Sequence, residues 1–179
     1  EAIQSHGIDR RIAFAILVRF GTSARGLVFG VMVATALLSM VISNTATVAM
    51  MVPIVLGIVE SVTDLTKPDA ASVESSATNL QTGMLLGTAY AASLGGVGTL
   101  IGTPPNAIVV GQLDELLGYE ITFVDWLAVG LPMVVVTLPV AWALLTYVVY
   151  PPEQYDVTEA RERARTRLES MGSLSPAAR

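Results

Sequence analysis

The stretch Ser43-Asn44-Thr45-Ala46-Thr47 interrupts an apolar run, residues 27–59, that contains no charged side chain. A helix that spans a bilayer needs about 20 apolar residues, and division at 43–45 leaves two arms of only about 15 residues each. The sequence therefore predicts a re-entrant hairpin over 27–59, with two half-length helices meeting at a polar tip. Non-helical backbone at membrane depth is tolerated where it lines a cavity, so the tip is a candidate binding site.

The composition is that of an integral membrane protein. Hydrophobic residues make up 53% of the chain and charged residues 14%, with a mean hydropathy of +0.62. A soluble domain carries about 25% charged residues. The chain has no cysteine, which excludes disulfides, zinc–thiolate sites and thiol catalysis, and its net charge of −5 gives no basic footprint for nucleic acid. We expect an all-α membrane fold.

A second interruption lies at 95–106, where four glycines and two prolines follow an apolar segment. Glycine and proline are poor helix formers, so we expect a broken transmembrane helix over 82–117 with arms at 83–94 and 107–117. Residues 60–81 are polar and are expected to form a loop outside the hydrocarbon region, with a short helix before the next span. Residues 126–150 predict an ordinary transmembrane helix that ends near two interfacial tyrosines.

The ends of the chain and its basic residues predict a topology. Residues 8–20 suit an interfacial helix, and 155–171 suit either a second, cytoplasmic interfacial helix or a solvated charged helix. With a re-entrant hairpin, all ten Lys and Arg residues fall on one face, which the positive-inside rule makes cytoplasmic. Two tight spans within 27–59 give the same sidedness. The expected location is the plasma or inner membrane, and we expect the chain to be part of a longer protein.

The two interruptions supply neutral oxygen atoms and helix ends. Hydroxyl, amide and carbonyl oxygens suit sodium, and helix N-termini suit an anion. The alternative is that these small residues serve helix packing alone. The predicted sodium ligands are Ser39, Ser43, Asn44, Gly95, Gly96 and Gly98. The predicted anion-binding residues are Asn44, Thr45, Thr99, Thr103 and Pro104.

Two long motifs carry a family resemblance. Residues 39–47 together with Pro53, and residues 92–106, resemble the Ser-Asn-Thr signature and the unwound linker of the divalent anion/sodium symporter family. The resemblance implies one N-terminal repeat of an inverted-repeat transporter, and thus half of a substrate site. It also implies a homodimer, an elevator motion, and interfacial helices that connect the transport domain to a scaffold.

The function expected from this resemblance is sodium-coupled symport of a di- or tricarboxylate or of sulfate. A proton-coupled or arsenite-type carrier of the same superfamily, and an accessory membrane subunit without transport activity, remain alternatives. An intramembrane hydrolase with Ser39 or Ser43 as nucleophile would need a basic residue at membrane depth, and the arms contain no Lys or His. We therefore do not expect an enzyme.

Overall fold

The computed structural model describes residues 23–65 and 70–152, and every element within these residues is helical. The elements are α3 (Ala24–Ser39), α4 (Asn44–Leu65), α5 (Ala70–Val97), α6 (Pro104–Leu117), α7 (Phe123–Ala143) and the π-helical η1 (Leu144–Val149). The interfacial helices expected at 8–20 and 155–171 lie outside the described residues.

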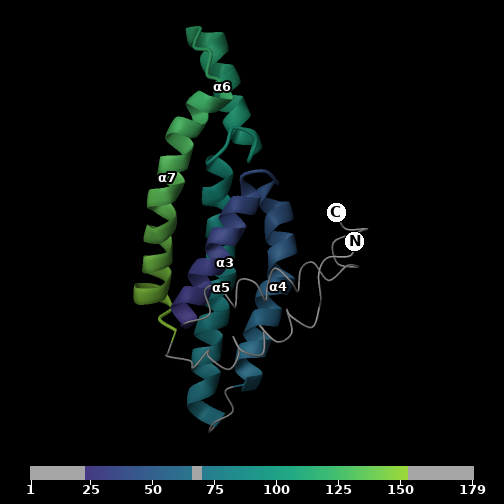
Figure 1. Ribbon diagram of the computed structural model, residues 1–179, viewed down its shortest axis with the longest axis vertical. Helices are drawn as coiled ribbons and strands as arrows, with labels where there is room; N and C mark the ends of the chain where they lie inside the picture. The colour runs from purple at the N-terminus through teal and green to yellow at the C-terminus, as the bar shows by residue number, and fades with distance from the viewer. Residues whose placement is uncertain (1–22, 66–69, 153–179) are drawn as a thin grey trace, which may run out of the picture.

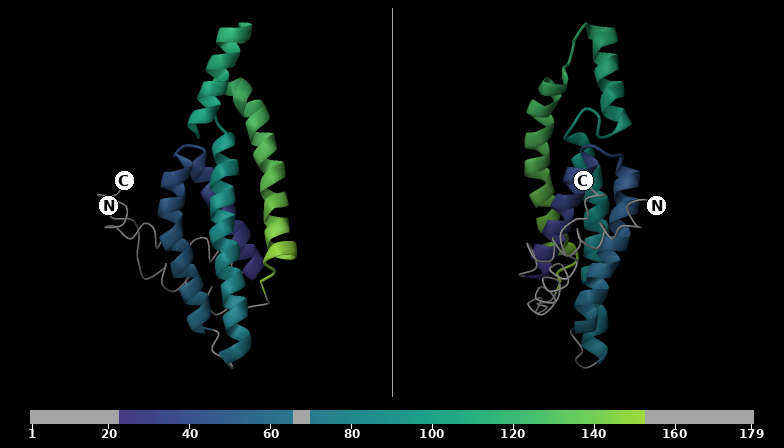
Figure 2. Two further views of the ribbon diagram at one scale, coloured as in Figure 1. Left: turned by 180° about the vertical axis from the view of Figure 1, so that it is seen from behind. Right: turned by 45° about the vertical axis from the view of Figure 1, so that its right-hand side comes forward.

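Helices α3, α4, α5 and α7 form a bundle, and α6 extends beyond it (Figure 1). The chain rises through α3, turns back at 40–43 and descends through α4. It then rises again through α5, continues past 98–103 into α6, and returns through α7 (Figure 2). Because α5 contacts α3, α4 and α7, it is the central helix of the bundle.

The core lies mainly between α3 and α5. Leu27, Val31 and Met32 of α3 are fully buried, as is Met84 of α5. Their counterparts on α4 are also fully buried or nearly so: Met51, Ile54, Val55 and Ile58. These residues recur at the three- and four-residue spacing that places apolar side chains on one helical face. The uncharged run 27–59 therefore forms α3 and most of α4, and each of these two helices buries one face in the bundle.

Glycines allow α3 and α5 to approach closely. A Cβ atom added to Gly95 would lie 2.3 Å from the Ala36 carbonyl oxygen and 2.6 Å from the Ala36 Cα. One added to Gly87 would lie 3.1 Å from Cγ of Met32. Membrane helices use small residues in this way to bring their backbones into contact. The contact fixes the end of α5 against the end of α3.

The helix boundaries differ from those expected. Helix α5 continues through Gly95 and Gly96 to Val97, although the sequence predicted unwinding from 95. Each glycine costs a helix about 1 kcal/mol relative to alanine, but here the glycines also permit the contact with α3. The polar segment 60–81, expected as a loop with a short helix before the next span, is helical up to Leu65 and again from Ala70.

Phe123–Val149 is long and apolar enough to cross a membrane, and it is the one such helix among the described residues. At its start, Thr122 and Asp125 form a capping box. The apolar parts of α3 and α4, Ala24–Ser39 and Asn44–Glu60, are shorter than a full span.

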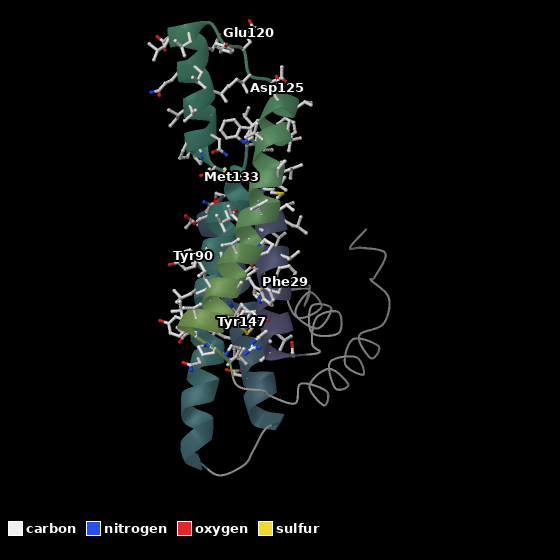
Figure 3. The ribbon with its side chains drawn as sticks, turned by 90° about the vertical axis from the view of Figure 1, so that its left-hand side faces the viewer. Phe29, Tyr90, Glu120, Asp125, Met133 and Tyr147 are labelled. Atoms are coloured by element: carbon white, nitrogen blue, oxygen red, sulfur yellow. The ribbon has the colours of Figure 1, made fainter. Side chains whose placement is uncertain are left out.

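Arg25 and the acidic residues Glu120 and Asp125 lie at opposite ends of the bundle. Glu120 and Asp125 lie at the end where α6 meets α7, far from Tyr147 (Figure 3). At the Tyr147 end, the Arg25 guanidinium lies 4.4 Å from the centroid of the Tyr147 ring. The indole of Trp142 donates to the Arg25 carbonyl oxygen over 3.0 Å, which joins α3 to α7. Arg25, the one Lys or Arg among the described residues, therefore lies at the end of the bundle opposite Glu120 and Asp125.

The contact of Gly95 with Ala36 predicts a selective loss of stability. We expect Gly95→Ala to destabilise the purified protein by about 1–3 kcal/mol, because the added methyl meets backbone that cannot rotate away. The matched control is Gly57→Ala, where an added Cβ meets nothing within 4 Å. The midpoint of thermal unfolding in detergent should fall for Gly95→Ala and stay or rise for Gly57→Ala. Equal midpoints would contradict the packing described.

Candidate ion and anion site

The first part of the site is the turn between α3 and α4. Helix α3 ends with the amides of Met40 and Ile42 bonded to the carbonyls of Ala36 and Leu38, at 3.1 and 3.0 Å. Ser43 caps α4: its hydroxyl accepts from the Ala46 amide over 3.4 Å, and its carbonyl from the Thr47 amide over 2.9 Å. A serine in this position satisfies donors that the first helical turn leaves free. The turn therefore places a helix C-terminus beside a helix N-terminus.

The second part is the break between α5 and α6, at 98–103. The Gly98 amide bonds to the Gly95 carbonyl over 2.9 Å, and the chain then leaves the helix. Thr103 is extended, with φ −147° and ψ 142°, and Pro104 and Pro105 occupy the first turn of α6. Proline suits these positions because it has no backbone N–H, and an N–H in the first turn would have no acceptor within the helix. This break again places a helix C-terminus beside an N-terminus.

The two parts are in direct contact. The Thr99 hydroxyl donates to the Met40 carbonyl oxygen, so the linker is bonded to the turn. The side-chain oxygen Oδ1 of Asn44 lies 2.3 Å from the place where Gly96 would carry a Cβ atom. Any larger residue at 96 would displace Asn44. Figure 2 shows the tip of the α3–α4 pair beside the linker.

Ser39 connects the same elements from inside the bundle. Its side chain is fully buried, and its hydroxyl lies 2.8 Å from Asn44 Oδ1 and 2.6 Å from the Ala92 carbonyl oxygen. The carbonyl oxygen of Ser39 would lie 3.0 Å from a Cβ atom at Gly102. Ser39 thus lies where the end of α3, the start of α4 and the linker meet.

Asn106 is a residue of this site that the sequence reasoning did not select. It is buried, and its amide nitrogen Nδ2 donates to the carbonyl oxygens of Gly96 and Thr99, each over 2.8 Å. A polar side chain directly after two prolines, within an apolar segment, was the available signal. That Asn106 donates hydrogen bonds across the break can be seen only once the chain is folded.

The last turn of α5 has its carbonyl groups satisfied by protein donors. Gly95 is bonded by the Gly98 amide, Gly96 by Asn106, and Val97 by the indole of Trp126 over 2.9 Å. The close approach of α7 at Gly130 makes the last bond possible, since a Cβ there would lie 2.9 Å from the Val97 oxygen. An unsatisfied carbonyl in lipid costs several kcal/mol. A carbonyl oxygen has two lone pairs and can bind an ion in addition to one donor.

The residues predicted as ligands fall into two groups. Four lie together where the turn meets the linker: Ser39, Asn44, Gly96 and Thr99. Gly95 packs against Ala36, and a Cβ at Gly98 would meet Met40 and Val134 at 3.0 and 3.1 Å. Ser43, Thr45 and Pro104 are exposed and Thr103 is half-buried, all at the first turns of α4 and α6.

The electrostatics of the site come from helix ends and neutral oxygens. Residues 26–59 and 79–113 contain no charged side chain. The C-termini of α3 and α5, which carry partial negative charge, lie at the same level as the N-termini of α4 and α6, which carry partial positive charge (Figure 1). Among the described residues, no group of three or more His, Cys, Asp and Glu could hold a metal ion. Such an arrangement suits a monovalent cation and an anion bound side by side.

Comparison with known proteins identifies the family. The profile described as "Sodium:sulfate symporter transmembrane region" matches residues 1–179. The chain belongs to the sodium:sulfate symporter family. It is 36% identical over 173 residues to the sodium-dependent dicarboxylate transporter SdcS of Staphylococcus aureus, covering 97% of this chain and 33% of the relative. Identity to the protein of the same name from Staphylococcus saprophyticus is 34% over 177 residues, with the same coverage of each chain.

Family membership confirms several predictions. The resemblance to sodium-coupled anion symporters was correct, the family is one of transporters and not of enzymes, and sodium is its coupling ion. The chain is a membrane protein, as its composition predicted. It spans about a third of the length of the curated relatives that it matches.

The bond from Thr99 to Met40 predicts a local change. We expect Thr99→Val to destabilise the turn by about 1 kcal/mol, because valine keeps the shape of threonine but leaves the Met40 carbonyl without this donor. Hydrogen exchange by mass spectrometry should show faster exchange at 40–43. In the control Thr137→Val, the lost bond is to a carbonyl within its own helix, at 2.7 Å from Met133 oxygen, and exchange at 40–43 should be unchanged. Unchanged exchange in Thr99→Val would contradict the link between turn and linker.

Proposed function

We propose that this chain forms the sodium site and one side of the anion site of a sodium-coupled secondary transporter, with a dicarboxylate as the leading substrate. The observation that carries the proposal is the contact between the α3–α4 turn and the α5–α6 break, made by Asn44 over Gly96 and by Thr99 on Met40. Tricarboxylates and sulfate are further substrates of the same charge class. The name of the relatives supports dicarboxylate, and the family description supports sulfate.

Sodium binds at the turn side of this contact, in our proposal. The oxygens of Ser39 and Asn44 lie 2.8 Å apart, and Ser43 and the carbonyls of Gly95, Gly96 and Gly98 complete the candidate ligand set. All are neutral oxygens, as a hard cation requires, and the C-terminal ends of α3 and α5 add partial negative charge. Gly96 has a second role here, since its missing side chain leaves the space that Asn44 fills.

The anion binds at the exposed N-termini of α4 and α6. Asn44 and Thr45 belong to the first turn of α4, and Thr103 and Pro104 stand at the start of α6, with Thr99 between them in the linker. Amides in the first turn of α4 and the hydroxyls of Thr45 and Thr103 can donate to carboxylate or sulfate oxygens. Helix α6 begins with two prolines, which have no N–H, so it contributes the partial positive charge of its N-terminus. No Lys or Arg lies in 26–59 or 79–113, so bound sodium supplies the full positive charge nearby. Each ion therefore improves the binding of the other, which is the basis of coupling.

The wider architecture follows from the same proposal. Helices α3 and α4 enter and leave the bilayer on one side as a re-entrant hairpin, and α5 and α6 cross it as one broken helix. The chain contributes one of two inverted repeats of a multi-pass plasma-membrane or inner-membrane protein. The remainder of a longer protein supplies the second half of the anion site. In a homodimer, this half-site moves across the membrane as part of an elevator domain.

Asn44→Ala tests the sodium assignment. In proteoliposomes with the full-length protein that contains this chain, we expect the sodium concentration for half-maximal succinate uptake to rise about tenfold or more, because one ligand worth about 1.4 kcal/mol is lost. Thr137→Val serves as the control, because it removes a bond within α7 and none to the turn or the linker. A sodium dependence equal to wild type would contradict the assignment. Uptake by wild type that is indifferent to sodium would overturn the proposed coupling itself.

Thr45→Ala tests the anion assignment. The hydroxyl of Thr45 is exposed at the N-terminus of α4, so its removal should not affect folding. We expect the KM for succinate to rise about three- to tenfold at saturating sodium, while the thermal unfolding midpoint stays within the error of wild type. An unchanged KM, or a KM change that follows a loss of stability, would place the anion elsewhere.

A further inference from the structure

We propose that Asn106 is a positioning residue for the cation site, where it holds the break between α5 and α6 in the shape that places the linker carbonyls beside Asn44. The inference rests on the proposed function, because it assigns Asn106 a part in sodium binding. Its starting observation is that one buried amide group bonds two carbonyl oxygens on the other side of the break, Gly96 and Thr99, each at 2.8 Å.

Asn106 joins α6 to the end of α5 and to the linker by two hydrogen bonds. The side chain comes from the first turn of α6, and its two bonds reach back to the last turn of α5 and to the linker. A primary amide has two N–H donors, so both are used without sharing. The side chain is only 6% exposed, which removes competition from water. The linker path is therefore fixed at both of its ends by one residue.

The two residues that Asn106 holds both contact the α3–α4 turn and the first residue of α4. Gly96 lies beneath the Asn44 side chain, and the Thr99 hydroxyl bonds to the Met40 carbonyl oxygen. A shift of either residue changes the spacing between the linker oxygens and the oxygens of Ser39 and Asn44. Cation affinity and selectivity depend on the number and placement of such oxygens. Asn106 thus acts on the cation site without needing to touch the ion.

Trp126 provides a natural comparison, because it also bonds a carbonyl at the end of α5. Its indole donates to Val97 from the α7 side, where Gly130 approaches the same carbonyl. Loss of that bond removes one donor from the same helix end, but it leaves the two bonds from Asn106 to Gly96 and Thr99 in place. A structural role alone would weaken sodium binding in each variant only in step with its loss of stability. The positioning role makes only the loss of Asn106 specific for sodium.

The experiment compares Asn106→Leu with Trp126→Phe in the full-length protein. Leucine has the branched shape and the heavy-atom count of asparagine but no donor, and phenylalanine keeps an aromatic ring in place of tryptophan without its N–H. Succinate uptake into proteoliposomes is measured against sodium concentration, and the maximal rate is normalised to folded protein. We expect the half-saturating sodium concentration of Asn106→Leu to rise at least about tenfold, with a smaller change in the normalised maximal rate. Trp126→Phe should stay within about twofold of wild type at the same measure.

A second measurement keeps the inference falsifiable if transport is lost. Purified wild-type protein should gain thermal stability in sodium chloride relative to choline chloride, and Asn106→Leu should lose most of that gain. Asn106→Ser, which retains one donor, should lie between the two and so serves if leucine prevents folding. A sodium response of Asn106→Leu equal to wild type, or equal losses in Asn106→Leu and Trp126→Phe, would overturn the positioning role. A wild-type protein without any sodium response would overturn the proposed function as well.

Discussion

The close approach of α3 to α5 is the constraint on which the rest of the site depends. Gly95 lets the α5 backbone rest on Ala36, and Gly96, one residue later, leaves room for the Asn44 side chain. Without that approach, the turn at 40–43 and the break at 98–103 would be two separate defects in apolar helices. Because the helices approach, hydrogen-bond donors of the break satisfy acceptors of the turn, as the Thr99 hydroxyl does for the Met40 carbonyl. Polar backbone can then persist in an apolar bundle at acceptable cost.

The same arrangement explains how a region without charged side chains can favour both a cation and an anion. Two helix C-termini and two N-termini meet at one level, so regions of opposite partial charge lie next to each other. A fixed arginine would hold an anion whether or not sodium is present. Helix ends and hydroxyls bind more weakly, so the anion depends on the co-bound ion. In our proposal, the lack of charge in 26–59 and 79–113 is what makes transport coupled.

The sequence was informative where a local rule decides the structure. The polar stretch after Ser39, the serine cap of α4 and the two prolines that open α6 each follow from local preferences. The helix ends that flank the turn and the break lie within a few residues of those expected, whereas α5 begins at Ala70, well before the expected arm. Gly95 and Gly96 misled because their propensity favours unwinding, whereas contact with α3 and Asn44 keeps them helical. Asn106 was missed because its partners, seven and ten residues away, come within reach only when the linker is folded.

The central claim is that the turn and the break form one cation site, and thallium tests it most directly. Thallium(I) is a monovalent cation that scatters X-rays anomalously and can replace sodium at oxygen sites. Crystals of the full-length protein soaked in a thallium salt should show an anomalous peak within bonding distance of Asn44 Oδ1 and of a linker carbonyl between 95 and 99, and excess sodium should abolish it. A peak at another place, or none at this contact while transport remains sodium-dependent, would contradict the account.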